Sequence, residues 1–119
     1  MRPLLQALAQ GLELGLEEPL PPAPFVYTTA IRCDAGLTRS LAGITLLARE
    51  IGFARDAETV YSADGRSATY HAQHGDRAVA LAVEVCPSRQ TVAIAVSGHN
   101  NSEAFELFQQ ADQQLFGLC

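Results

Sequence analysis

Between Ala78 and Val96 the chain alternates large and small residues on both sides of a short Cys-Pro-Ser-Arg turn. Successive residues of a β-strand point to opposite faces, so this pattern predicts a hairpin with two unequal faces. One face carries the large aliphatic residues Val79, Leu81, Val83, Val85, Val92, Ile94 and Val96. The other face carries Ala78, Ala80, Ala82, Ala93, Ala95 and Ser97. We expect the large face to carry the core and the small face to lie against another surface.

The rest of the chain predicts two main helices and three further strands around this hairpin. The expected strands cover residues 25–33, 58–62 and 66–73, and the expected helices cover residues 37–51 and 101–116. Asp64-Gly65 is typical of a type I′ turn between two of these strands. Helices grouped beside an antiparallel sheet form two layers. We therefore expect an α+β two-layer sandwich, with a mostly antiparallel sheet of about five strands and two helices on one face.

The N-terminal part has a different pattern, with leucines at helical spacing from about residue 3 to residue 16 and prolines between residues 19 and 24. The leucines predict an amphipathic helix, and the prolines predict an extended connector. We therefore divide the chain into this N-terminal helical arm with its connector (1–24) and one α+β domain (25–119). Leu5 and Leu12 are the candidate contact residues of the arm, which packs either on its own domain or on a neighbouring chain.

Composition narrows the class of partner. The chain has 119 residues and a net charge of -5, and all eight basic residues are arginines. Nucleic acids and anionic membranes both require clustered positive charge, so neither is expected as a partner. No apolar run reaches the roughly 18 residues of a membrane-spanning helix, and no secretion signal is expected at the N-terminus. The three cysteines have no Cys-x-x-Cys spacing, so they predict neither a disulfide framework nor a zinc site, and we expect a cytoplasmic protein.

The segment from Ser97 to Ser102 joins a predicted buried strand to a predicted helix. Backbone amides at the start of a helix lack partners within the helix, so such a junction can hold an anion such as phosphate or carboxylate. The candidate ligand-binding residues are Gly98, His99, Asn100, Asn101 and Ser102. The same residue types are also what a tight turn with a helix cap requires, and both interpretations remain open.

The remaining candidates for chemistry are isolated side chains. Glu84 is the only charged residue among the alanines of the small face, which suits a general acid or base, but a pair with an arginine such as Arg89 is the simpler interpretation. His71 and His74 are expected on a strand and the turn that follows it, where positions three apart face opposite ways, so they indicate surface and turn residues and no shared metal site. Cys33 is either a reactive thiol or a small core residue. We expect no catalytic residues, no metal and no cofactor.

These observations favour an interaction protein over an enzyme. The candidate contact residues are Ala78, Ala80, Ala82, Glu84, Ala93 and Ala95, together with Leu5 and Leu12. An acidic, helix-flanked sheet is similar in a general way to small bacterial chaperones and adaptors that dimerise through a sheet face, although strands precede the central helix in secretion chaperones. We predict a non-catalytic adaptor or chaperone-like module, a homodimer that binds a protein partner through the small face or the arm. The alternative is a small-ligand-binding protein or an enzyme that uses the 97–102 loop.

Overall fold

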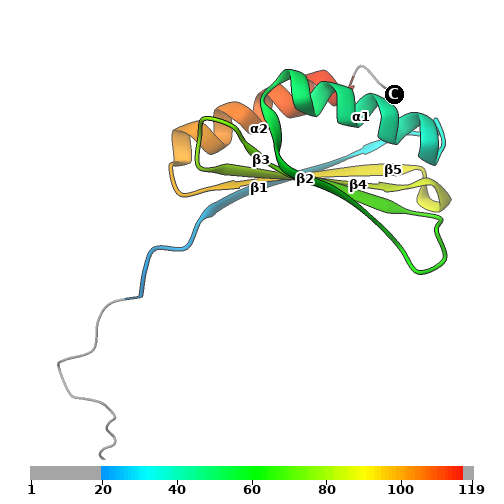
Figure 1. Cartoon of the computed structure of the whole chain (residues 1–119), viewed down its shortest axis with the longest axis horizontal. Coiled ribbons are helices and arrows are strands. Elements are labelled where there is room, and N and C mark those ends of the chain that lie inside the picture. Colours follow the sequence, from blue (N-terminus) through cyan, green and yellow to red (C-terminus); the bar gives the residue numbers. More distant parts are fainter. Residues whose placement is uncertain (1–19, 117–119) are drawn as a thin grey trace, which may run out of the picture.

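The computed structural model describes residues 20–116 of the chain, which form one sheet and two helices (Figure 1). The elements are β1 (Phe25–Arg32), α1 (Leu37–Glu50), β2 (Phe53–Tyr61), β3 (Ala68–His74), β4 (Val79–Cys86), a short 3-10 helix (Pro87–Arg89), β5 (Thr91–Gly98) and α2 (Asn101–Phe116). All neighbouring strands are antiparallel, and both helices lie on one face of the sheet. The predicted α+β fold is confirmed, whereas the predicted helix at residues 3–16 lies outside the described residues.

The large face of the β4–β5 hairpin forms the centre of the core, as predicted. Its seven aliphatic side chains, Val79, Leu81, Val83, Val85, Val92, Ile94 and Val96, are each no more than 3% exposed. Helix α1 packs on β2, β3 and β4, and α2 packs on β5 and β1. Ile44 and Ala48 face the sheet from α1, and Ala104, Leu107 and Ala111 do so from α2. The apolar stripes of both helices therefore close the same core from one side.

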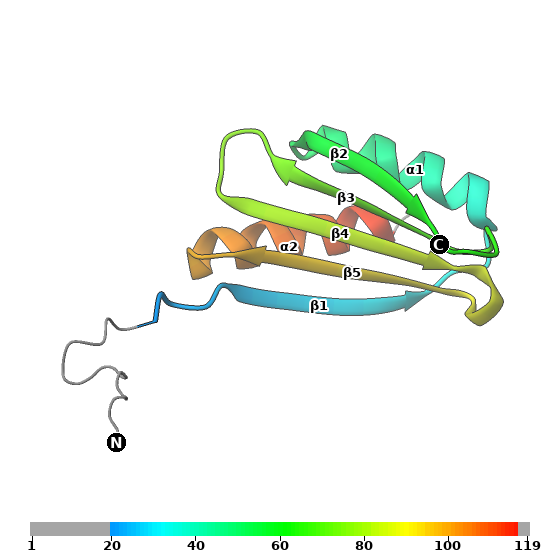
Figure 2. The ribbon, with the colours of Figure 1, turned by 60° about the horizontal axis from the view of Figure 1, so that its bottom comes forward.

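The order of the strands in the sheet is β1-β5-β4-β3-β2, so the first strand of the chain pairs with the last (Figure 2). Strands β2 to β5 follow one another as a meander, because each is joined to the next by a short connection. Strand β1 runs along β5 from Phe25 opposite Gly98 to Arg32 opposite Thr91. The two edges of the sheet are therefore β1 and β2.

Strand β2 begins at Phe53 instead of residue 58, because an irregular pairing hides its first half from the sequence pattern. Its register against β3 shifts between Phe53 and Arg55 and again between Arg55 and Glu58. Asp56 lies within this irregularity and has a positive φ of 51°. A bulge of this kind interrupts the two-residue alternation by which a strand is recognised. The charged stretch around Asp56 therefore belongs to the sheet, although its sequence has no strand signature.

The connection between β2 and β3 is longer than the predicted two-residue type I′ turn. That turn requires a positive φ at both central residues, and here Gly65 has one (71°) whereas Asp64 does not. The loop closes instead through a bond from the Ser62 amide to the Ser67 carbonyl (2.9 Å). Ser62 Oγ donates to Asp64 Oδ1 (2.7 Å), and this bond, with a second from the Arg66 amide, lowers the pKa of Asp64. The type I′ prediction is therefore wrong.

The link from α1 to β2 depends on a contact between Gly52 and the buried ring of His74. Gly52 ends the helix with a φ of 101°, and a Cβ on it would lie 2.3 Å from His74 Nε2. The Asp76 amide donates to His74 Nδ1 (3.1 Å), so the ring proton is on Nε2, which donates to the Ile51 carbonyl (3.1 Å). The ring also meets Phe53 edge-on. His74 therefore ties the end of α1 to the β3–β4 loop.

Tyr70 provides a test of the core by pH. Its buried hydroxyl donates to the Phe53 carbonyl (2.9 Å), and burial raises its pKa although the Arg49 charge acts in the opposite direction. The folded state therefore holds the phenol proton more tightly than the unfolded state, so this stability is present below about pH 10 and is lost as the pH rises above it. Urea unfolding from pH 7 to 11 should show the loss, and Tyr70→Phe should show less of it. An equal loss in Tyr70→Phe would assign it to other groups.

Candidate functional site

The face of the sheet opposite the helices has no cover from any element within residues 20–116 (Figure 1). We call it the open face, and define it by Thr28, Ala30, Thr69, His71, Ala80, Ala82, Glu84, Ala93, Ala95 and Ser97. Each of these residues is exposed or half-buried, and on β3, β4 and β5 they alternate with buried core residues. The small side of the predicted hairpin is thus the centre of a wider surface, which β1 and β3 extend on either side.

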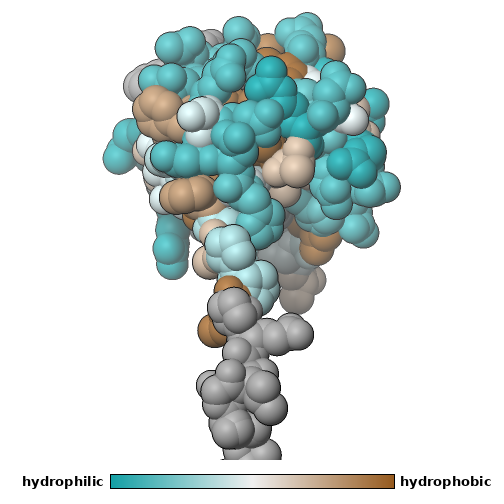
Figure 3. Space-filling view, turned by 90° about the vertical axis from the view of Figure 1, so that its left-hand side faces the viewer, coloured by the Kyte–Doolittle hydropathy of each residue, from teal (hydrophilic) through white to brown (hydrophobic). Residues whose placement is uncertain are grey.

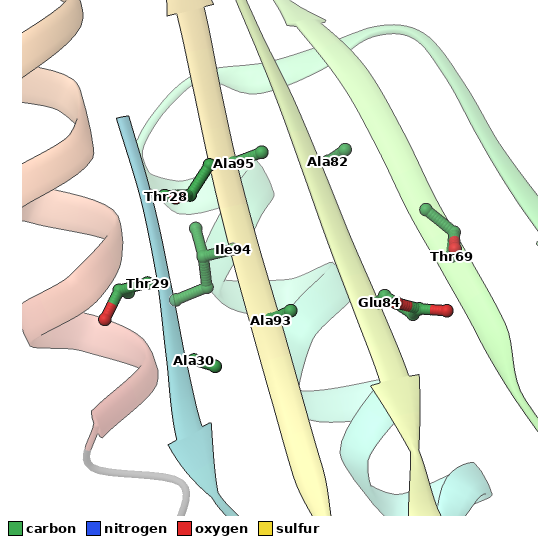
Figure 4. A pocket seen from close by; sticks show the side chains of 9 residues that line it. All are labelled: Thr28, Thr29, Ala30, Thr69, Ala82, Glu84, Ala93, Ile94 and Ala95. Atoms are coloured by element: carbon green, nitrogen blue, oxygen red, sulfur yellow. The ribbon is translucent and has the colours of Figure 1, made fainter. Parts of the chain in front are cut away.

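A shallow hollow of about 570 Å³ lies on this face (Figure 4). It is lined by Thr28, Thr29, Ala30, Thr69, Ala82, Glu84, Ala93, Ile94 and Ala95. Three alanine methyls, from Ala82, Ala93 and Ala95, lie between the threonines of β1 and the polar pair Thr69 and Glu84. The hollow exists because these side chains are short, so the surface is close to the backbone of β4 and β5. The bottom of the hollow is formed by alanine methyl groups, and one carboxylate, that of Glu84, lies at its side.

Glu84 does not form the predicted pair with an arginine. In the register of the sheet it stands opposite Thr69 on β3 and Ala93 on β5, and no ion pair joins it to any described residue. Arg89 belongs to the 3-10 helix beyond the end of β4, so it does not face Glu84 across a strand pair. The predicted pair with Arg89 is therefore wrong. Glu84 remains an exposed, unpaired carboxylate beside the hollow.

The two histidines lie on opposite sides of β3, as their spacing predicts. His71 is on the open face, with Nε2 3.5 Å from Glu58 Oε1 of β2. His74 is on the helix side and is buried, so it is not the surface turn residue that the sequence indicates. Within residues 20–116 no group of three or more histidine, cysteine or acidic side chains is placed to hold a metal ion. The histidines therefore serve an edge contact and the core, respectively.

Cys33 follows β1 and lies in the core, 7% exposed, as one of the two sequence interpretations predicts. It is disulfide-bonded, which the cysteine spacing did not indicate and which rules out its role as a reactive thiol. Disulfides are typical of oxidising compartments, so this one does not support the cytoplasmic location expected from the cysteine spacing. That location stays a prediction. None of the helices described in residues 20–116 has the length and apolar character needed to cross a bilayer.

The loop that joins β5 to α2 is explained by its own packing. Gly98 is crowded, because a Cβ there would lie 3.0 Å from the Ala78 carbonyl oxygen. Asn100 caps α2, since its Oδ1 accepts the Glu103 amide (3.0 Å), and Asn101 accepts a hydrogen bond from the Tyr27 hydroxyl. His99 and Ser102 are exposed, and the end of the molecule that holds this loop is mostly hydrophilic (Figure 3).

These contacts favour the cap interpretation of the loop over the ligand-binding one. A hollow of about 270 Å³ borders Gly98 and His99, and its lining includes no carboxylate or arginine. The ligand-binding role of residues 98–102 stays a prediction that no contact supports. The sequence signal for the cap was present, because Asn100 and Glu103 have the spacing of a helix start.

The arginines of the loops do not gather into a basic patch. Arg66 in the β2–β3 loop and Arg89 after β4 lie at one end of the sheet, whereas Arg77 in the β3–β4 loop lies at the other end (Figure 1). Arg77 is also paired with Glu106 of α2 (3.5 Å). A nucleic acid needs several cations on one surface, and this distribution does not provide them.

Among the predicted contact residues, Ala80, Ala82, Glu84, Ala93 and Ala95 are brought together on the open face. Ala78 precedes β4 and is exposed at the rim, and Leu5 and Leu12 lie outside the described residues. The sequence did not indicate the aromatic cluster in which Tyr27 of β1 meets Phe105 and Phe108 of α2. No family model, no curated protein and no solved structure matches this chain, so the open face must be interpreted from its own geometry.

Proposed function

We propose that this protein is a non-catalytic, homodimeric interaction module that binds a protein partner through the open face. The observation that carries the proposal is a sheet face lined by alanine and threonine, with a hollow of about 570 Å³, over which no described element packs. Titratable side chains on this face are few: Glu84 stands apart, and His71 lies 3.5 Å from Glu58 at the β2 side of the sheet. The surface offers area for contact, and its histidine–carboxylate pair, His71 and Glu58, is solvent-exposed and does not line the hollow.

The residue types on the open face suit contact better than water. Antiparallel sheets often leave one face in solvent, and then carry polar, β-branched or charged residues there. Alanine is a poor strand former, and five alanines occupy the open face: Ala30, Ala80, Ala82, Ala93 and Ala95. Small side chains let the backbone or the large side chains of another surface approach the sheet closely. We therefore interpret the alanines as the part of the open face that a partner contacts.

The chemistry of the open face limits the partner. Its hollow accepts large aliphatic side chains, which would remove methyl groups from water. Burying an isolated carboxylate costs several kcal/mol, so a partner that covers Glu84 must bring a cation or leave it at the rim. We expect a partner segment that presents leucine, isoleucine or valine to Ala82 and Ala95, with an arginine or lysine near Glu84.

The N-terminal arm is the second contact in this proposal. Its leucines, including Leu5 and Leu12, have helical spacing, and the connector up to residue 24 joins it to the start of β1. We propose that these leucines add an apolar surface to the same partner complex. A chain that begins at residue 20 should keep its cooperative thermal unfolding and bind the partner more weakly.

Ala82→Arg should abolish the proposed contact, because a long cation would fill the hollow. The partner is first captured from the native host with the intact protein and identified, and its affinity is then measured with purified components by calorimetry. We expect a loss of at least tenfold, which corresponds to about 1.4 kcal/mol. Thr38→Arg, on the exposed side of α1, is the matched control and should bind normally. Equal affinity of the Ala82→Arg protein and the wild type would refute the proposal.

A further inference from the structure

The two edge strands of the sheet, β1 and β2, differ in how well they are protected against pairing with a further strand. Along β2 the pairing with β3 is irregular at two places, Asp56 has a positive φ, and Arg55, Asp56 and Glu58 are charged. Bulges and charges on an edge strand are devices that prevent another strand from pairing with it. Strand β1 has neither bulge nor proline, and its only charge is Arg32 at its end. The β1 edge is therefore the one that can accept a strand.

The backbone groups available on β1 can be assigned from one hydrogen bond. The Cys33 amide donates to the Gln90 carbonyl (2.8 Å), so the peptide groups of Cys33 and of every second residue before it point toward β5. In an antiparallel pair these directions alternate along the strand. The amides and carbonyls of Val26, Thr28, Ala30 and Arg32 consequently point away from β5. They form a regular row of donors and acceptors that no described strand uses.

Exposed apolar side chains gather at the same edge. Phe25 and Val26 of β1 are 47% and 58% exposed, and Phe105 of α2 is 43% exposed. Phe105 lies next to β1, because its ring centroid is 5.3 Å from that of Tyr27. Large exposed apolar groups clustered at one place are typical of a contact surface. The edge thus offers unpaired backbone groups with apolar side chains beside them.

We propose that β1 pairs antiparallel with β1 of a second copy of this chain, and so joins two sheets into one of ten strands. The inference goes beyond the proposed function, with which it shares only the homodimeric state. Strand β1 suits a copy of itself because an antiparallel arrangement places the two Arg32 side chains at opposite ends of the new pair. The two positive charges are therefore far apart and do not repel each other. The alternative occupant, an extended peptide from another protein, has no support in the described residues.

The register of this pair follows from the sheet itself. Residues opposite one another in an antiparallel pair share a face, so odd residues must meet odd residues when both copies keep their helices on the same side. A twofold axis at Thr29 satisfies this rule. It places Val26 opposite Arg32 and Thr28 opposite Ala30 of the second copy, and so uses all four outward-pointing residues.

The helices fit the same arrangement. Helix α2 packs on β1 and β5 and does not extend the sheet, so its axis runs near the edge strand. With strands about 4.8 Å apart, a helix midway between β5 and β1 would meet its symmetry mate at an axis separation of about 10 Å. Packed helices lie about 8–10 Å apart, so Phe105 would become buried between them. The two open faces would form one continuous surface on the other side.

Thr28→Pro tests the pairing, because proline lacks the amide hydrogen that points outward from β1 and leaves the bonds to β5 in place. By light scattering, the wild type should have twice its mass of 12.7 kDa, and Thr28→Pro should have half the wild-type value with an unchanged circular dichroism spectrum. Thr28→Val keeps the amide and should remain a dimer. A monomeric wild type, or a folded Thr28→Pro protein that remains dimeric, would overturn the proposal.

Hydrogen exchange of the wild type provides a test that needs no variant to fold. The amides of Val26, Thr28, Ala30 and Arg32 should be protected at high protein concentration and lose this protection on dilution, in step with the mass. Rapid exchange of these four amides at every concentration would also overturn the proposal. Ala82→Arg should remain a dimer, so failure of the open-face contact and failure of the edge pairing give different results.

Discussion

Gly52→Ala is expected to destabilise the protein by about 2–5 kcal/mol. A left-handed backbone at a residue with a Cβ costs roughly 1–2 kcal/mol, and Gly52 has a φ of 101°. The new Cβ would also lie 2.3 Å from Nε2 of His74, so the ring must move. Moving it breaks its hydrogen bonds to the Ile51 carbonyl and the Asp76 amide, worth about 0.5–1.5 kcal/mol each. Urea unfolding at neutral pH measures the loss.

Gly65→Ala is the matched control for this prediction. Gly65 also has a positive φ, 71°, but a Cβ there would meet nothing within 4 Å. It should therefore show only the backbone cost, and the difference between the two variants measures the clash with His74. In a His74→Ala background, where the ring is gone, Gly52→Ala should cost no more than Gly65→Ala. If it costs as much as in the wild type, the contact with the ring is not the cause.

Val83→Arg is expected to prevent folding, whereas Ala82→Arg next to it is expected to leave the fold intact. Val83 is fully buried in the core, opposite Tyr70 on one side and Ile94 on the other. Burying an unpaired charge there costs several kcal/mol, and removing the valine adds to this, so the change approaches the whole stability of a small domain, about 5–15 kcal/mol. Ala82 is on the open face, where an arginine head group reaches solvent.

The comparison is read by circular dichroism and thermal unfolding. Ala82→Arg should unfold cooperatively within about 1 kcal/mol of the wild type, which also makes it a sound variant for measuring partner affinity. Val83→Arg should give no cooperative transition. If both variants unfold, the open face is packed against part of the chain in the monomer. If both fold, the alternation of the two faces has been assigned wrongly.

Much of the fold could be predicted because periodicity is strong where the core is made. The alternation from Ala78 to Val96 assigns each residue of the hairpin to a face, and the stripes at 37–51 and 101–116 give the helices that cover one of them. These signals are local, and burial of large aliphatic groups enforces them. The start of β2 could not be predicted in this way, since the bulge at Asp56 removes the alternation.

Long-range contacts account for the rest of what the sequence did not indicate. The position of β1 beside β5 depends on which edge of the meander is available, and no turn joins the two strands. His74 is in a turn-like stretch, His-Gly-Asp, and it is buried because Gly52 and Phe53 approach its ring from the segment that links α1 to β2. The members of the open face were predicted from alternation, but the absence of a covering helix among residues 20–116 required the structure.

The pairing of β1 with β5 also has a consequence for synthesis. Residues 25–32 leave the ribosome well before the strand against which they pair, residues 91–98, is made. Contacts that are so distant in sequence slow folding, because a long loop must close before they form. A nascent chain would therefore hold an unpaired, apolar segment until β5 emerges. Moving that segment behind β5 by circular permutation should speed refolding.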